Sequence, residues 1–202
     1  EAVEKGFADE IVAVSCGPEK TQDTLRVAMA IGADRSVHVN CDSVLDPCTV
    51  AEVLSEIVRR ESPDLILMGK QATDNDCAQI PQMVSAFLNL PVATFANKIE
   101  IEGSAVTVQC ETDDGLMTVK GTLPAVVSCD LRLSEPRYVT LPMMMKAKKK
   151  PIEKIALADL GLDTARRVKI VEVEDAPKRE GGVKLDSVDA LIEQLKNVKK
   201  VL

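Results

Sequence analysis

The strongest constraint on the fold of this chain is a change of hydrophobic period between its segments. Between residues 10 and 124, short runs rich in β-branched residues are separated by stretches in which apolar residues recur with the helical period. The runs span residues 10–16, 36–40 and 64–68, and the helical stretches span residues 21–31, 50–60 and 77–88. Such an alternation is typical of βαβ units, whose parallel strands are buried between helices. We therefore expect an α/β protein built as a three-layer sandwich around a mainly parallel sheet.

After Pro91 the apolar residues alternate with polar ones, which is the period of a strand with one buried face. Turns that contain glycine separate the first three of these runs. The four runs span residues 95–101, 105–111, 116–123 and 125–129. We expect them to form a β-meander that is attached to the parallel sheet or continues it.

Beyond Asp130 the composition changes again. Four prolines interrupt the chain, residues 146–150 form a basic block, and a helical period returns only over residues 185–202. A segment of about 50 residues with so few apolar side chains cannot form a core of its own. We therefore divide the chain into an α/β core, residues 1–130, and an extended arm, residues 131–202, that packs on a neighbouring subunit.

Charge and composition exclude several classes of partner. The formal net charge is −7 and only four side chains are aromatic, so nucleic acid is not an expected partner. No apolar run reaches the roughly 18 residues that span a bilayer, so direct membrane insertion is not expected either. The six cysteines include no CxxC pair, which indicates free thiols in a reducing compartment rather than a metal site.

The sequence offers no self-sufficient catalytic site. It contains no Walker A loop and no GxGxxG, GxSxG or HExxH motif. Its single histidine, His38, lies in the middle of an expected strand, where a structural role is the usual one. We therefore expect no catalytic residue and no bound metal.

Two expected strand ends carry residues suited to binding a nucleotide. The strand at residues 64–68 runs into a polar loop, residues 69–76, and the first strand ends at Cys16 and Gly17. In an open α/β sheet, ligands bind beyond the carboxyl ends of the strands, where backbone N–H groups and a helix N-terminus meet an anion. Many purely structural βα loops have the same composition, so the pattern alone leaves both interpretations open.

An apolar cluster directly precedes the basic block. It consists of Tyr138, Leu141, Pro142, Met143, Met144 and Met145. Flexible Met-rich surfaces suit adaptable partner binding, and the lysines that follow would attract an acidic partner. The alternative is that the lysines form a solvated helix face while Leu141 packs on its own subunit.

Several stretches closely resemble one protein family. They are AVSCGP at residues 13–18, RVAMAIGADRSVHV at 26–39, LMGKQATDND at 67–76, LPAVVS at 123–128 and LRLSEPRYVTLPMMMKAKKK at 131–150. On these motifs the chain resembles the beta subunits of electron-transfer flavoprotein over essentially its whole length. The resemblance implies an adenine-nucleotide alpha-hydrolase-like fold and a first strand that precedes residue 1.

The resemblance implies an electron carrier rather than an enzyme. In this family the beta subunit pairs with a larger alpha subunit, which holds most of one FAD, while AMP is buried in the beta subunit. The carrier accepts electrons from acyl-CoA dehydrogenases of fatty acid β-oxidation and passes them to a membrane-bound quinone oxidoreductase. The implied location is the mitochondrial matrix, or the cytoplasm if the source is a bacterium.

The resemblance also assigns roles to residues. The implied AMP site comprises Cys16, Gly69, Lys70, Gln71, Ala72, Thr73, Asp74, Asn75, Asp76, Cys77, Ala78, Gln79 and Ile80. The apolar cluster becomes the recognition loop, in which Leu141 inserts into a pocket on the dehydrogenase. Lys146 and Lys149 occupy positions that the family methylates.

The chain departs from the commoner animal form of the family within the implied AMP site. Ala78, Ile80 and Pro81 stand where that form has Asn, Thr and Gly. Without these polar side chains, and without an N–H at Pro81, phosphate binding would depend on backbone donors and Gln79.

Two other functions are compatible with the α/β core. A free-standing adenine-nucleotide sensor of the universal-stress type would share the core but would leave residues beyond 130 without a role. A bifurcating electron-transfer flavoprotein would hold a second FAD in place of AMP, although the recognition sequence argues against it. The nucleotide found in this subunit would discriminate between these functions.

Overall fold

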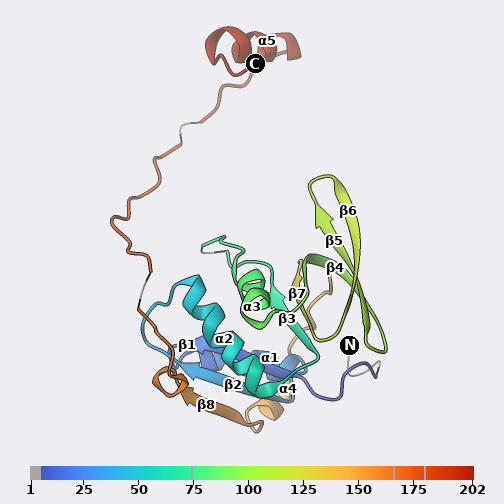
Figure 1. Cartoon of the computed structure of the whole chain (residues 1–202). Helices are drawn as coiled ribbons and strands as arrows, with labels where there is room; N and C mark the ends of the chain where they lie inside the picture. Colours follow the sequence, from blue (N-terminus) through green and yellow to red (C-terminus); the bar gives the residue numbers. More distant parts are fainter. Residues whose placement is uncertain (1–5, 74, 166, 180) are drawn as a thin grey trace. The chain divides into compact units, whose positions relative to one another are not determined.

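The computed structural model describes residues 6–73, 75–165, 167–179 and 181–202 (Figure 1). The chain divides into two compact units, Glu1–Val168 and Lys169–Leu202. The first unit is an α/β structure with a parallel sheet, a mixed sheet and helices packed on both, so the fold class expected from the sequence is confirmed.

The parallel sheet has the strand order β1-β2-β8. Its strands are β1 (Val12–Gly17), β2 (Arg35–Asn40) and β8 (Ile152–Ala156). β2 is the central strand, and its residues alternate between two buried faces. Val37 and Val39 pack in one apolar cluster with Val53 and Ile57 of α2 (Pro47–Glu61). The opposite face is covered by α1 (Thr21–Ile31) and α4 (Leu141–Ala147).

Helix α2 joins the parallel sheet to the second sheet. It begins at an N-cap, Asp46, whose carboxylate accepts a hydrogen bond from the Thr49 N–H at 2.9 Å, and Pro47 follows in the first turn. Ala51 of the same helix packs with Val84 of α3 (Ile80–Leu88) and with Val126 of the second sheet. Apolar residues of α2 therefore pack against both sheets.

The second sheet has the strand order β3-β7-β4-β5-β6. Its strands are β3 (Leu65–Gly69), β4 (Val92–Glu102), β5 (Ala105–Thr112), β6 (Gly115–Thr122) and β7 (Ala125–Cys129). β4, β5 and β6 form the expected antiparallel meander. β7 instead lies between β3 and β4 and is parallel to both. Its four buried residues, 125–128, suit a strand covered on both faces, so placing this run within the meander was wrong.

Two boundaries differ from the sequence expectation. The helix expected from residue 77 begins only at Ile80, because Asp76 and Ala78 adopt positive φ angles of 49° and 48°, which a right-handed helix does not allow. The short strand β8 was not anticipated at all. It is stabilised by its parallel pairing with β2, in which Ile155 lies opposite Val39. The first unit therefore extends well past residue 130.

Helix α4 is held on α1 by reciprocal hydrogen bonds. Arg26 of α1 donates to the carbonyl oxygens of Ala147 and Lys150 at 2.7 and 2.6 Å. The Nζ of Lys150 donates to the carbonyl oxygens of Met29 and Ala33 at 3.1 and 2.6 Å. Carbonyl groups at or just beyond the C-terminal ends of both helices thus receive charged donors. The final element of the first unit is a 3₁₀ turn, η1 (Leu157–Leu160).

The second unit, Lys169–Leu202, contains a short helical segment. It consists of α5 (Val188–Glu193) and a π-helical turn, η2 (Gln194–Val198). Ser187 caps α5 by accepting a hydrogen bond from the Ala190 N–H at 3.2 Å. The helix expected over residues 185–202 is thus present in shorter form. The expectation that residues 131–202 pack on a partner subunit stays a prediction.

In the described part of the chain, no helix combines the length and the apolar character needed to cross a membrane. Within the same residues, no three His, Cys, Asp or Glu side chains come together as a metal site would require.

Candidate nucleotide and docking sites

The turn after β1 is held tightly by its backbone. The carbonyl oxygen of Gly17 accepts hydrogen bonds from the Cys41 N–H at 3.0 Å and from His38 Nε2 at 2.9 Å. A Cβ atom on Gly17 would lie 2.6 Å from Thr21 Oγ1, so only glycine lets α1 begin this close to the strand. His38 is fully buried, and its Nε2 is engaged by the Gly17 carbonyl group.

Cys16 lies one residue before this turn and is half-buried. Its side chain packs beside the apolar cluster between the parallel sheet and α2. Burial, and secondarily the neighbouring Cys41, raises the pKa of the Cys16 thiol to about 11. Cys16 therefore stays a neutral thiol at physiological pH and offers a small apolar contact rather than a charge or a nucleophile.

The loop after β3 is open and mainly polar. Residues 71–73 and 75–77 are exposed, whereas Asp74 lies outside the described residues. Two local contacts shape the loop: Gln71 Nε2 donates to Asp76 Oδ1 at 2.9 Å, and the Asp76 N–H donates to the Ala72 carbonyl oxygen at 2.9 Å. The positive φ angles of Asp76 and Ala78 then turn the backbone toward α3.

The start of α3 has the features of an anion site. Its N-cap residue, Gln79, makes no capping hydrogen bond with its side chain. The backbone N–H groups of a first helical turn have no partner within the helix, and they carry the positive end of the helix dipole. Oε1 of Gln82, in this turn, is buried without a hydrogen-bond partner in the described part of the chain. The N–H groups of such a turn are suited to donating to an anion.

Lys70, the second residue of the implied loop, is already paired. Its Nζ lies 2.6 Å from Oδ2 of Asp130, the first residue after β7. The hydrogen bond from Lys70, followed by the one from the Arg132 N–H, holds the pKa of the Asp130 carboxyl well below its usual range. Sequence reasoning missed Asp130 and Arg132. The sequence pattern that could have indicated this ion pair is a charged residue directly after each of two apolar strands, Lys70 after β3 and Asp130 after β7.

The structure brings some of the implied AMP residues together and leaves one apart. Residues 69–80, of which Asp74 lies outside the described part, are one segment of chain that runs from the end of β3 to the first turn of α3. Cys16 belongs to the other sheet, and across the described residues no hydrogen bond joins it to this loop. Helix α2 packs against both the sheet that contains Cys16 and the sheet that precedes the loop.

The apolar cluster at residues 138–145 divides into a packed part and an exposed part. Met143 and Met144 pack beside Met29 and Ala147 in the cluster between α1 and α4. Tyr138, Leu141 and Met145 are instead 88%, 77% and 55% exposed. Within the described residues, Leu141 therefore lies at the surface and does not join the packed part of the cluster.

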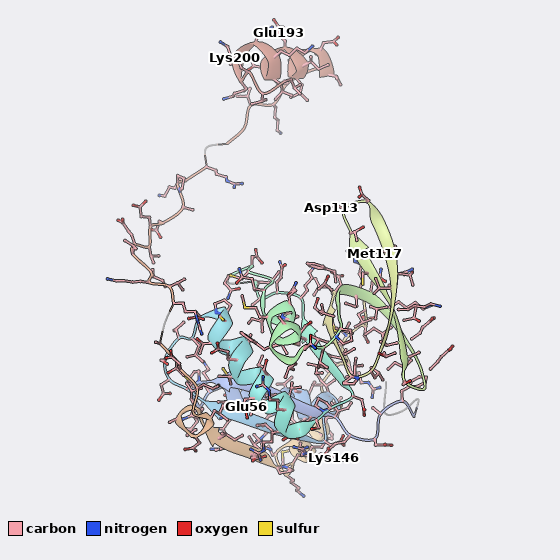
Figure 2. The ribbon with its side chains drawn as sticks, in the orientation of Figure 1. Glu56, Asp113, Met117, Lys146, Glu193 and Lys200 are labelled. Carbon is pink, nitrogen blue, oxygen red and sulfur yellow. The ribbon has the colours of Figure 1, made fainter. Side chains whose placement is uncertain are left out.

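The lysines beside this cluster have two different environments. Lys146, in the last turn of α4, and Lys149 are exposed, and Figure 2 shows the Lys146 side chain at the lower edge of the first unit. Lys150 is engaged by the carbonyl groups at the end of α1 and is only partly exposed. The basic block thus contains both surface cations and a structural one.

Comparisons with known proteins give one consistent answer. Residues 1–160 match the family described as electron transfer flavoprotein domain. The chain is 47% identical over 202 residues to the electron transfer flavoprotein subunit beta of Bos taurus, with 98% of this chain and 79% of that protein covered. It is 49% identical over 193 residues to the same-named protein of Dictyostelium discoideum, covering 96% and 77%. An Arabidopsis thaliana relative named as mitochondrial is 49% identical over 196 residues, covering 96% and 78%.

Proposed function

The chain belongs to the electron transfer flavoprotein family as a beta subunit, and we propose that it is the AMP-binding and partner-docking half of an electron carrier. Such a subunit works with an alpha subunit. FAD, held mainly by the alpha subunit, supplies the electron-carrying chemistry when it is bound. The residues of this chain bind, orient and dock, and we propose no catalytic role for any of them.

The observation that carries the AMP proposal is the uncapped first turn of α3 behind an exposed loop. Pro81 removes one N–H from this turn, but the turn retains the N–H groups of Ile80 and Gln82. The phosphate would meet these donors and the backbone of residues 69–79, and Gln79 could add its side-chain amide. Cys16 would contribute an apolar contact, because its thiol is neutral at physiological pH.

For partner docking, the support is the exposed part of the apolar cluster on a firmly anchored helix. Leu141 and Met145 face solvent on α4, whose end is fixed by Arg26 and Lys150. A rigid apolar anchor surrounded by cations suits a partner with an apolar pocket and an acidic rim. We propose acyl-CoA dehydrogenases as these partners and a quinone oxidoreductase as the electron acceptor.

We further propose that the chain works in mitochondria, specifically in the matrix, where the partner dehydrogenases of fatty acid oxidation would be met. The support is the mitochondrial name of a relative that is 49% identical. Import of a tagged full-length form and its release with matrix markers would test this location. Release with membrane fragments after extraction at high salt would contradict it.

One experiment tests the cofactor proposal as a whole. The full-length form of this chain is co-expressed with an alpha subunit, the complex is purified and denatured, and the released nucleotides are identified by chromatography. We expect one AMP and one FAD per heterodimer. Two FAD would replace the proposal with the bifurcating type, and an adenine nucleotide on a chain that forms no complex would favour the free-standing sensor.

A further inference from the structure

Lys70 and Asp130 are neighbours although they lie 60 residues apart in the sequence. In the parallel register of β3 and β7, Gly69 lies opposite Cys129. The residues that follow, Lys70 and Asp130, are therefore neighbours beyond the carboxyl ends of the two strands. The Lys70 N–H donates to the Cys129 carbonyl oxygen at 3.1 Å. Lys70 is therefore fixed at its backbone as well as at its ammonium group.

Both carboxylate oxygens of Asp130 are engaged. Oδ2 accepts from Lys70 Nζ, while Oδ1 accepts from the Arg132 N–H at 3.1 Å and from Arg132 Nε at 3.2 Å. The Asp130 N–H donates to the Ala96 carbonyl oxygen at 2.9 Å. The Asp130 side chain is only 3% exposed, so its charge depends on these donors rather than on water.

Phe95 completes the surroundings of the ammonium group. It lies in an irregularity of β4 and has a φ angle of 56°, which is strained for a bulky residue. Its N–H donates to Ser128 Oγ at 3.0 Å, and its ring centroid lies 5.5 Å from Lys70 Nζ. The strained backbone therefore places an aromatic face where it attracts the cation.

We propose that Lys70 anchors the nucleotide loop and is not a ligand of the phosphate. Asp130 and the Phe95 ring hold its ammonium group, and this fixes the first residues of the segment 69–80 against β7. The inference rests on the proposed AMP site. Moving the ammonium to a phosphate would leave the buried Asp130 carboxylate with only the Arg132 donors, which is unfavourable. The phosphate is then bound by backbone donors of the anchored loop.

Calorimetry of AMP binding to the full-length heterodimer distinguishes the anchor from a ligand. The variants are Lys70→Met, Asp130→Asn and the double variant. Lys98→Met is the matched control, because Lys98 forms an exposed ion pair with Glu100 at 2.7 Å. We expect each single variant to weaken AMP binding about tenfold, with the double variant no weaker, because both remove one shared interaction. Lys98→Met should bind like the wild type, and Lys70→Arg should retain most of the affinity.

Other outcomes overturn the anchor. If Lys70 binds the phosphate, Lys70→Met weakens binding whereas Asp130→Asn leaves it unchanged or tightens it by freeing the lysine. Additive losses in the double variant, or wild-type affinity in Lys70→Met, would also contradict the proposal.

A second readout does not require AMP. Hydrogen exchange of residues 69–80 in the nucleotide-free heterodimer should be faster in Lys70→Met and in Asp130→Asn than in wild type, and unchanged in Lys98→Met. A wild-type protein that binds no AMP would remove the proposed function while this measurement still tested the anchor. Unchanged exchange in both variants would remove the anchor while leaving AMP binding intact.

Discussion

The nucleotide loop, residues 69–80, and helix α4 are both exposed parts of the first unit, but they are held by different kinds of interaction. The loop is tied at its start by a side-chain ion pair, Lys70 with Asp130. α4 is tied at its end by Arg26 and Lys150, which donate to backbone carbonyl groups. Backbone carbonyl acceptors do not titrate, whereas a carboxylate does. The position of the loop therefore depends on one buried charge, whereas the position of α4 depends on hydrogen bonds to backbone carbonyl groups of packed helices.

The two segments also present different groups to a ligand. The loop offers polar side chains and leads into α3, whose N-cap residue makes no side-chain cap hydrogen bond among the described residues, whereas α4 offers the apolar side chains of Leu141 and Met145. The first suits a small anionic ligand, and the second suits the hydrophobic pocket of a protein partner. The proposed nucleotide site and the proposed docking site therefore involve different segments of the subunit.

The largest expected effect comes from removing the anchor of α4. Lys150→Met deletes two charged hydrogen bonds to the carbonyl oxygens of Met29 and Ala33. We expect the free energy of unfolding of the heterodimer to fall by about 3 kcal/mol, as measured by denaturant titration. Lys149→Met is the control, because Lys149 is exposed. Equal stabilities of the two variants would show that Lys150 is not an anchor.

A smaller effect is expected at the surface of the same helix. Leu141→Ala should weaken docking of an acyl-CoA dehydrogenase by about 2 kcal/mol while leaving unfolding unchanged, because the side chain is exposed in the subunit alone. Leu116→Ala, at a 61% exposed leucine of β6, is the matched control. Electron-transfer rates measured against dehydrogenase concentration give both affinities. Identical curves for Leu141→Ala and wild type would remove the docking proposal.

Low pH should affect the stabilising contacts of the two segments differently. The folded-state pKa of Asp130 lies below its unfolded value, so its contribution to stability is present above the unfolded pKa, about 4, and is lost as the pH falls further. The stability difference between wild type and Asp130→Asn should therefore shrink below that pH, whereas the difference caused by Lys150→Met should not. Denaturant titrations between pH 7 and pH 3 measure both. A constant Asp130→Asn difference would show that the carboxylate is not stabilised by Lys70 and Arg132.

The smallest effect concerns thiol labelling. The pKa of Cys16 is raised to about 11 by burial, so its thiol should remain unlabelled by iodoacetamide at pH 8, while the exposed Cys77 in the loop reacts. Peptide mass spectrometry of the labelled heterodimer distinguishes the two sites. Adding AMP should slow labelling of Cys77 if the nucleotide covers the loop. Rapid labelling of Cys16 would contradict its neutral, half-buried state.

Local patterns were enough to predict the elements whose own residues determine them. Helix α1 matches the expected residues 21–31, because its apolar period is regular and Gly32 ends it. β8 was missed because its few apolar residues give a weak local pattern, whereas its stability comes from pairing with β2 and packing in clusters that are remote in sequence. The apolar run of β7 was recognised as a strand, but nothing local distinguishes the end of a meander from a central position.

The candidate site divides in the same way. The loop after β3 and the apolar residues of α4 could be found from the sequence, because each is a continuous segment. The ion pair of Lys70 with Asp130 could not, because it exists only when β3 and β7 are in register. The exposure of Leu141 could not be predicted either. The sequence shows that residues 141–145 are apolar, but not that Met143 and Met144 pack inward while Leu141 faces outward.

The most direct test of the account is hydrogen exchange of the full-length heterodimer, measured with and without AMP and with and without an acyl-CoA dehydrogenase. We expect AMP to protect residues 69–83 and to leave residues 138–145 unchanged. The dehydrogenase should do the reverse. Protection of residues 138–145 by AMP, or no protection of the loop by AMP at saturating concentration, would contradict the separation of the two sites.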